Sequence, residues 1–178
     1  MDNTLSSPKP TIAFVVAMSQ NRVIGVNNGL PWHLPADMKW FVKVTMGKPV
    51  IMGRRTYDSI PARFRPLPGR HNIVVSRNRQ YAAPGATVVD SLAEALVVAG
   101  ADRPEEIMIG GGSSLYEALL PQAGRIYLTL VEADLDGDAF FPPLDWSQWQ
   151  TSFRQVHEPD AKHVYRFEWM ILDRITPV

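Results

Sequence analysis

Residues Ile12 to Met18 read IAFVVAM, a continuous apolar run that contains β-branched residues. Such a run is typical of a strand buried on both faces of a sheet. A long segment rich in Gly, Asn and Pro follows over residues 19–33, and a helical stretch opens at Leu34-Pro35, where proline suits the first turn of a helix. The start of the chain therefore predicts a buried strand, a long loop and then a helix.

The remaining chain repeats this alternation of strand and helix. Further strands are predicted at Lys48–Met52, Asn72–Ser76, Ala86–Val89, Ile107–Ile109 and Arg125–Glu132. Helices are predicted at residues 54–60, 91–100 and 113–120, the second of them opened by the capping box SLAE at Ser91. Residues 153–156 and 164–172 predict a closing hairpin. We therefore expect an α/β fold: a mostly parallel central sheet, helices on both faces and a C-terminal antiparallel hairpin.

Composition restricts the class of protein. The 178 residues suit a single domain, which we expect over residues 11–178, behind a disordered or extended tail at residues 1–10. Lys plus Arg and Asp plus Glu each number 18, so no global charge points to nucleic acid or an anionic membrane. The chain has no cysteine, signal peptide or membrane-length apolar segment. We expect a cytoplasmic monomer, because no helix has an evident exposed apolar face.

Anion-binding residue types follow three of the predicted strands. They are Gly53-Arg54-Arg55-Thr56, Ser76-Arg77 and the glycine-rich stretch Gly110–Ser114. Each alone is equally well explained as a tight turn or a solvated arginine. Ligands of open α/β sheets bind beyond the carboxyl ends of the strands, so the three together favour a multiply phosphorylated ligand such as a dinucleotide. The spacing matches neither G-x-G-x-x-G nor a Walker sequence.

A second cluster surrounds Asp37, within the segment Leu30–Phe41. If a helix begins near Pro35, Asp37 and Phe41 share a face, and the carboxylate lies among apolar and aromatic side chains. Two interpretations remain open: Asp37 stabilises the helix dipole, or it binds a flat ligand that has paired N–H donors. His33 is interpreted as a packing or surface residue, and the histidine spacing predicts neither a metal site nor a nucleophilic triad.

Seven short motifs together resemble the bacterial dihydrofolate reductases from about Ile12 to the C-terminus. In chain order they are Val23-Ile24-Gly25, Leu30-Pro31-Trp32, Leu34-Pro35-Ala36-Asp37, Pro49–Arg54, Pro66–Arg70, Gly111–Tyr116 and Tyr127-Leu128-Thr129. The resemblance implies reduction of 7,8-dihydrofolate to tetrahydrofolate by hydride transfer from NADPH, in a pocket that antifolates also bind. The Ile24–Trp32 segment is long and rich in Gly and Asn, which predicts a lid over the nicotinamide of this cofactor.

The resemblance assigns roles to individual residues. Asp37 would be the catalytic carboxylate that holds the pterin 2-amino group and N3, with Thr129 bound to it through water. Val15, Val16, Met38 and Phe41 would form the walls for the pterin and benzoyl groups, and Arg70 would bind the glutamate α-carboxylate. The implied cofactor-binding residues are Ala17, Ile24, Gly25, Leu30, Gly53, Arg54, Arg55, Thr56, Ser76, Arg77, Gly111, Gly112, Ser113, Ser114, Leu115 and Tyr116.

Two positions depart from the family pattern, and two other functions compete with this one. The loop at Pro61–Arg65 is about three residues longer than in the shortest family members, as the resemblance indicates, and Gly110 replaces an aliphatic residue, which predicts a lost packing contact. One competing function is a reductase of riboflavin synthesis that acts on a ribosylamino-pyrimidine. That enzyme would share the phosphate site but would lack the Trp32–Asp37 block. The other is a non-catalytic NADPH-binding module, which would bind cofactor without dihydrofolate.

Overall fold

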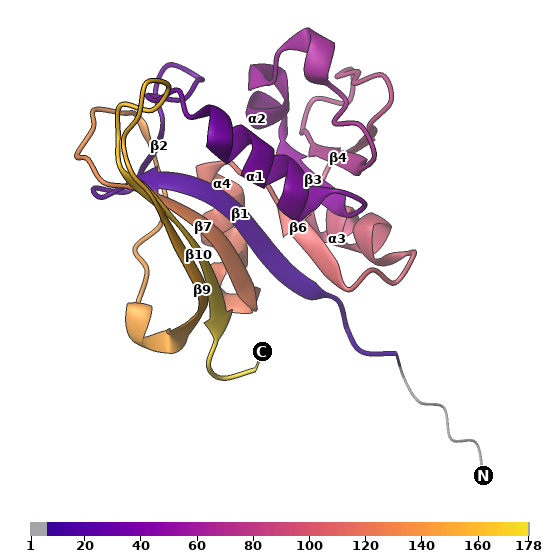
Figure 1. Cartoon of the computed structure of the whole chain (residues 1–178). Helices are drawn as coiled ribbons and strands as arrows, with labels where there is room; N and C mark the ends of the chain where they lie inside the picture. The colour runs from indigo at the N-terminus through magenta and orange to yellow at the C-terminus, as the bar shows by residue number, and fades with distance from the viewer. Residues whose placement is uncertain (1–6, 178) are drawn as a thin grey trace.

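The computed structural model describes residues 7–177, which form one large sheet and one small sheet (Figure 1). The large sheet has the strand order β5-β4-β3-β6-β1-β7-β10-β9. Its strands are β1 (Thr11–Ser19), β3 (Pro49–Gly53), β4 (His71–Val75), β5 (Thr87–Val89), β6 (Glu106–Ile109), β7 (Arg125–Val131), β9 (Trp149–His157) and β10 (Phe167–Arg174). The strands from β5 to β7 pair in parallel, whereas β10 is antiparallel to both of its neighbours. The predicted mostly parallel sheet with a C-terminal hairpin is confirmed.

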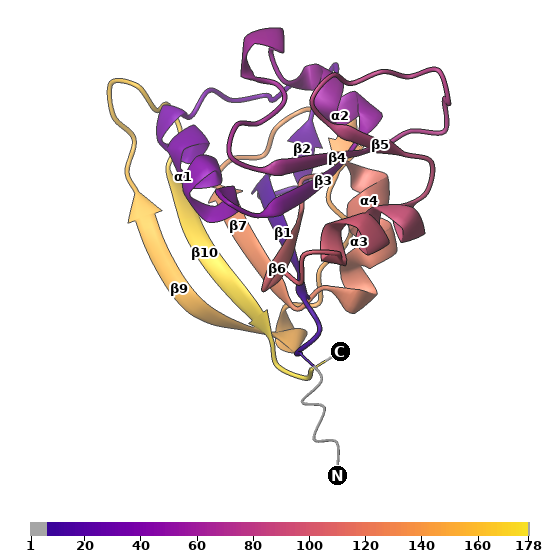
Figure 2. The same ribbon diagram turned by 90° about the vertical axis from the view of Figure 1, so that its right-hand side faces the viewer.

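Helices cover both faces of this sheet, as predicted (Figure 2). Helix α1 (Pro35–Thr45) lies on one face, and α3 (Leu92–Gly100) and α4 (Ser113–Leu119) lie on the other. Helix α2 (Arg54–Ser59) follows β3, and short 3-10 turns occupy Ala62–Phe64, Leu120–Gln122 and Trp146–Gln148. Helix α4 ends at Leu119, one residue before the predicted end, and Pro121 lies inside the 3-10 turn that follows.

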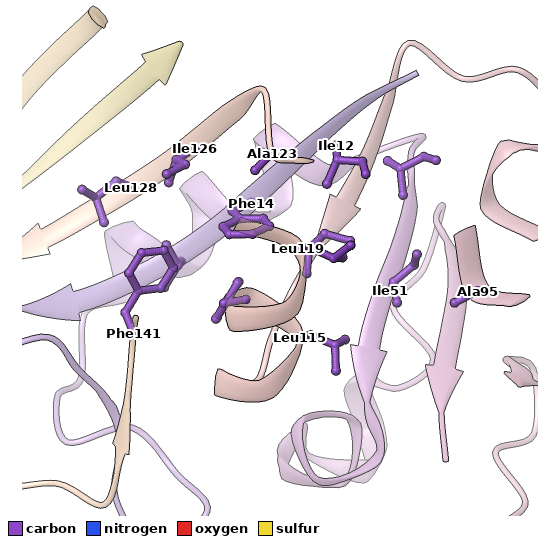
Figure 3. Packing of buried hydrophobic residues seen from close by; sticks show 14 of the residues in the cluster. Ile12, Phe14, Ile51, Ala95, Leu115, Leu119, Ala123, Ile126, Leu128 and Phe141 are labelled. Carbon is purple, nitrogen blue, oxygen red and sulfur yellow. The ribbon is translucent and has the colours of Figure 1, made fainter. Parts of the chain in front are cut away.

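Alternation along the strands divides the buried side chains into two clusters. Phe14 packs with Leu115 and Leu119 on the side of α3 and α4 (Figure 3), while Val15 packs with Val44 on the side of α1. Successive residues of a strand point to opposite faces, which is why neighbours on β1 enter different clusters. The sheet thus separates the residues that pack beneath α1 from those that pack beneath α3 and α4.

A small antiparallel sheet was not predicted from the sequence. It pairs β2 (Val23–Gly25) with β8 (Ala139–Phe140). These strands are too short for any periodicity to be read, and β2 lies in the Gly- and Asn-rich stretch that indicated a loop. Next to the pair, Asp138 Oδ2 accepts a hydrogen bond from the Asn27 amide over 3.0 Å. This bond ties the expected lid segment to the loop before β8.

The ends of the chain bear on two expectations. Residues 1–6 of the expected tail and Val178 lie outside the described residues, and residues 7–10 belong to no helix or strand. Within residues 7–177, none of the helices combines the length and apolarity needed to cross a bilayer.

Candidate active site

Asp37 lies in the first turn of α1, where two side chains from the sheet bind its carboxylate. Thr129 Oγ1 donates to Asp37 Oδ1 over 2.6 Å, and Trp169 Nε1 donates to the same oxygen over 3.0 Å. The two donors are neighbours because Thr129 on β7 and Trp169 on β10 are partners in the strand register. Within residues 7–177 both protein donors use Oδ1, which leaves Oδ2 for a ligand.

Asp37 is half-buried, which alters the pKa of its carboxyl. Burial raises the pKa of the Asp37 carboxyl above its ordinary value, and the hydrogen bonds from Thr129 and Trp169 partly oppose that rise. A carboxyl in such a setting is typical of a functional site. The structure also corrects one expectation: Thr129 binds Asp37 directly rather than through water.

The expected walls of the pocket are only partly brought together. Val15 shares a buried cluster with Phe41, on the side of α1. Val16 lies in the cluster of the opposite face, so its side chain is not a wall of this pocket, because strand residues alternate in direction. Met38 follows Asp37 on α1, and its side chain is 56% exposed, available to a ligand rather than to the core.

Arg70 is held in a defined orientation near the end of α1. Its Nε donates to the Pro68 carbonyl over 2.9 Å, and its Nη1 donates to Thr45 Oγ1 over 3.1 Å. The guanidinium carbon lies 5.9 Å from the ring centre of Phe41, and burial lowers the pKa of the group. A guanidinium fixed in this way is suited to bind a carboxylate with its remaining N–H groups.

The residues expected at the cofactor site follow neighbouring strands of the sheet. Four adjacent strands carry these residues, in the order β4, β3, β6 and β1. A hydrogen bond joins the end of β3 to the loop after β6: the Gly53 amide donates to the Gly111 carbonyl over 2.9 Å. Gly111 has a φ of +108°, which a side chain would strain, and a Cβ added at Gly112 would lie 3.4 Å from Thr56 Oγ1. Both glycines are therefore closely packed, and a side chain at either would crowd Tyr116 or Thr56.

The cationic and hydroxyl groups of this edge differ in exposure. Arg55, Arg77 and Ser114 are exposed, Thr56 and Ser113 are half-buried, and Ser76 is buried. The Arg54 guanidinium lies 5.8 Å from the ring centre of Tyr81. The Ser76 hydroxyl accepts from the Asn78 amide over 3.2 Å, so part of its hydrogen-bonding capacity is used within the turn.

Leu115 and Tyr116 support the site from beneath. Both are buried in the core, and the Tyr116 hydroxyl donates to the Val15 carbonyl over 2.7 Å. Burial raises the pKa of that hydroxyl, which keeps it protonated. Gly110 is explained by space: an added Cβ would lie 3.2 Å from Met52 Cγ. The expected loss of a packing contact is thus wrong, because Met52 already fills that volume.

The expected nicotinamide-side residues come from two elements and the loop that follows. Ala17 is near the end of β1, Ile24 and Gly25 form part of β2, and Leu30 is 55% exposed beyond it. A Cβ at Gly25 would lie 3.3 Å from the Gly29 carbonyl, so glycine permits the tight turn between them. An exposed leucine beside a site is available to cover a bound ring.

Sequence reasoning missed Trp169, which contacts Asp37 directly. It is distant in the chain, and only the pairing of β7 with β10 brings it to the site.

A separate open depression of about 640 Å³, lined by Arg22, Phe140, Trp149 and Arg174 among others, includes Ser113 but no residue around Asp37. The site around Asp37 is therefore recognised by its chemistry and not by this depression.

An open α/β sheet with cationic and hydroxyl side chains after its strand ends and a partly buried carboxylate is typical of nucleotide-dependent oxidoreductases. The sequence model of the dihydrofolate reductase family matches residues 11–174. The chain belongs to the dihydrofolate reductase family.

Individual relatives agree over nearly their whole length. Dihydrofolate reductase type 3 of Salmonella typhimurium is 48% identical over 163 residues, covering 92% of this chain and 98% of the relative. The enzyme of Haemophilus influenzae is 44% identical over 165 residues, covering 92% and 99%. A solved structure, dihydrofolate reductase from Enterococcus faecalis complexed with NADP(H) and RAB-propyl, superposes with a TM-score of 0.83 at 35% identity, covering 93% and 97%. The predicted family and enzyme class are confirmed.

Proposed function

We propose that this chain reduces 7,8-dihydrofolate to 5,6,7,8-tetrahydrofolate at the pocket around Asp37, with NADPH as the reductant. The observation that carries the proposal is the partly buried Asp37 carboxylate, whose Oδ1 is occupied by Thr129 and Trp169 while Oδ2 remains for a ligand. A carboxylate presented in this way accepts the paired N–H groups of a pterin, the 2-amino group and N3.

The substrate would extend from Asp37 towards Arg70. The flat ring would lie against Val15, Met38 and Phe41, and Arg70 would bind the α-carboxylate of the glutamate tail. Orienting the ring is the main contribution of these residues, because hydride transfer requires two flat rings held face to face. Apolar walls and close backbone suit this task better than a nucleophile.

Asp37 binds the side of the pterin away from N5, the atom that must gain a proton. An ordered water is therefore the immediate donor in this proposal, with Asp37 orienting and polarising the ring. Trp32 Nε1 is a buried donor without a protein acceptor within residues 7–177, and such a group calls for a water or a ligand. It supports the presence of ordered solvent near the Trp32–Asp37 block.

The cofactor would lie along the carboxyl ends of β4, β3, β6 and β1. NADPH, when bound, supplies the hydride. The backbone from Gly111 to Ser113 and the Thr56 side chain would bind the pyrophosphate, with Gly53 allowing close approach. Arg54, Arg55, Ser76 and Arg77 would bind the phosphates, including the 2′-phosphate. The donors on these adjacent strands and the close packing of the glycines fit this group.

The deciding experiment is a loss of NADPH absorbance on mixing the protein with NADPH and dihydrofolate. We expect turnover that requires both compounds. A protein that binds NADPH but does not oxidise it would instead support the non-catalytic module. Oxidation of NADPH with a ribosylamino-pyrimidine but not with dihydrofolate would support the other reductase. The Trp32–Asp37 block argues against both alternatives.

We also propose that residues 11–178 act as one domain of a cytoplasmic monomer that binds antifolates. The zero net charge and the lack of cysteine are consistent with this setting. Sedimentation of the purified protein at several concentrations tests the monomer, and competition between a 2,4-diaminopyrimidine and dihydrofolate tests antifolate binding.

A further inference from the structure

Helix α1, which carries Asp37, begins without a capping side chain of its own. Its N-cap residue is Leu34, and Pro35 has no amide hydrogen. The amides of Asp37 and Met38 both donate hydrogen bonds to the Leu34 carbonyl, over 3.0 and 3.3 Å. Among the first amides of the helix, Ala36 is therefore the one that needs an acceptor from elsewhere, and it is the neighbour of Asp37.

His163 supplies that acceptor from a distant part of the chain. Its Nε2 lies 3.1 Å from the Ala36 amide nitrogen. The residue belongs to the turn between β9 and β10, and its side chain is 6% exposed. Because the amide is the donor, Nε2 must be the nitrogen without a hydrogen, so the imidazole is neutral with its proton on Nδ1.

Asp160 fixes this tautomer. His163 Nδ1 lies 2.8 Å from Asp160 Oδ1, which also accepts from the amides of Lys162 and His163 over 2.8 and 2.9 Å. These hydrogen bonds, that from the His163 side chain foremost, lower the pKa of Asp160. The ionised carboxylate therefore holds the Nδ1 proton and points Nε2 at the helix.

We propose that His163, oriented by Asp160, is a positioning residue for the reaction because it caps α1 next to Asp37. The inference rests on the proposed function of Asp37. The β9–β10 hairpin then holds the first turn of α1 at two points, with Trp169 bound to the Asp37 carboxylate and His163 bound to the Ala36 amide. Loss of the cap would loosen the carboxylate without touching the cofactor edge of the sheet.

The same turn contains metal-ligand residue types, but the hydrogen bonds favour the cap. Ligand atoms of His157, Asp160 and His163 lie within 4.8 Å of one another. A metal on His163 Nδ1 would displace the proton to Nε2, which would then face the Ala36 amide as a second donor. The two arrangements exclude each other, so a chelator separates them.

The first test compares His163→Phe with His163→Gln. Phenylalanine keeps a ring in the cluster without an acceptor, whereas the glutamine Oε1 can replace Nε2. We expect His163→Phe to lower kcat/KM for dihydrofolate by about 2- to 30-fold, the loss that a missing cap implies, with NADPH affinity unchanged. His163→Gln should have a kcat/KM close to that of the wild type, and the kcat/KM of Asp160→Ala should lie between those of wild type and His163→Phe. Lys162→Ala is the control in the same turn: the Lys162 side chain is exposed and its backbone amide is what contacts Asp160, so this variant should retain wild-type turnover.

The second test does not depend on activity. Nitrogen NMR of the wild-type protein should show a neutral His163 with its proton on Nδ1, and hydrogen exchange at the Ala36 amide should be faster in His163→Phe than in wild type or His163→Gln. Turnover should survive treatment with EDTA.

Several outcomes overturn the cap. They are a proton on Nε2, equal exchange in the three proteins, wild-type kcat/KM in His163→Phe, or activity that EDTA removes and Zn²⁺ restores. A wild-type protein without turnover contradicts the proposed function instead, while the NMR results still decide whether His163 caps α1.

Discussion

Replacing Asp37 by Asn separates the pocket carboxylate from a helix-dipole residue. A protonated 2,4-diaminopyrimidine offers two parallel N–H donors that a carboxylate accepts with charge assistance, and a neutral amide cannot. Asn can still accept from Thr129 and Trp169 through Oδ1, so the change removes the charge with little effect on these contacts. Leaving the ligand cation unpaired in a buried site costs about 3–5 kcal/mol, or roughly 100- to 5,000-fold in affinity.

The assay is calorimetric binding of the diaminopyrimidine and of NADPH to the same folded variant, together with turnover at neutral pH. We expect the inhibitor affinity and turnover to fall and the NADPH affinity to stay, since the phosphate-binding groups follow other strands. Glu94→Gln is the matched control, because Glu94 lies in the first turn of α3. An Asp37 variant that keeps turnover and inhibitor binding, and loses at most about 1 kcal/mol of stability as that control does, would refute the reasoning.

The same variant should be more stable than wild type, in a manner that depends on pH. The folded protein binds the Asp37 proton more tightly than the unfolded chain, whose carboxyl keeps its ordinary pKa of 3.8, because burial raises the folded value. Ionised Asp37 therefore lowers the free energy of unfolding. This loss is complete above the pKa of Asp37 in the folded protein and absent below its pKa in the unfolded chain. Urea unfolding should show a stability gain for Asp37→Asn at neutral pH that shrinks in acid. A constant difference across this range would contradict the burial argument.

Three further changes test the other groups of the site. Trp169→Phe removes one donor to Asp37, so the pKa of this carboxyl should rise further and its inflection in the pH profile of turnover should move to higher pH. The control is Trp40→Phe, because Trp40 stacks on Trp169 without contacting the carboxylate, and it should leave the inflection in place. Arg70→Leu should raise KM for dihydrofolate far more than for a pterin without the glutamate tail, and equal effects would make Arg70 structural. Arg77→Ala should weaken NADPH by about 10- to 150-fold and leave NADH nearly unchanged, whereas equal losses would remove Arg77 from the 2′-phosphate.

The sequence by itself determined the α/β alternation, the parallel strands and the position of α1. These features depend on local patterns, namely apolar runs, the capping box at Ser91 and glycine-rich turns. The capping box illustrates this: the Glu94 amide donates to Ser91 Oγ over 3.1 Å, as the motif predicts. The same local patterns placed Asp37 in a first helical turn and arginines after strand ends, although they left two interpretations of each.

Only the tertiary structure decided what surrounds Asp37. Thr129 and Trp169 reach its carboxylate because β7 and β10 pair in one register, and a slip of β10 by one residue would turn Trp169 to the other face, away from Thr129. Such pairing depends on residues far apart in the chain, and no local pattern specifies it. His163 reaches the start of α1 for the same reason. Strand alternation alone puts Val15 and Val16 on opposite faces, and the packing of α1 decides that Val15 is the one on the side of Asp37.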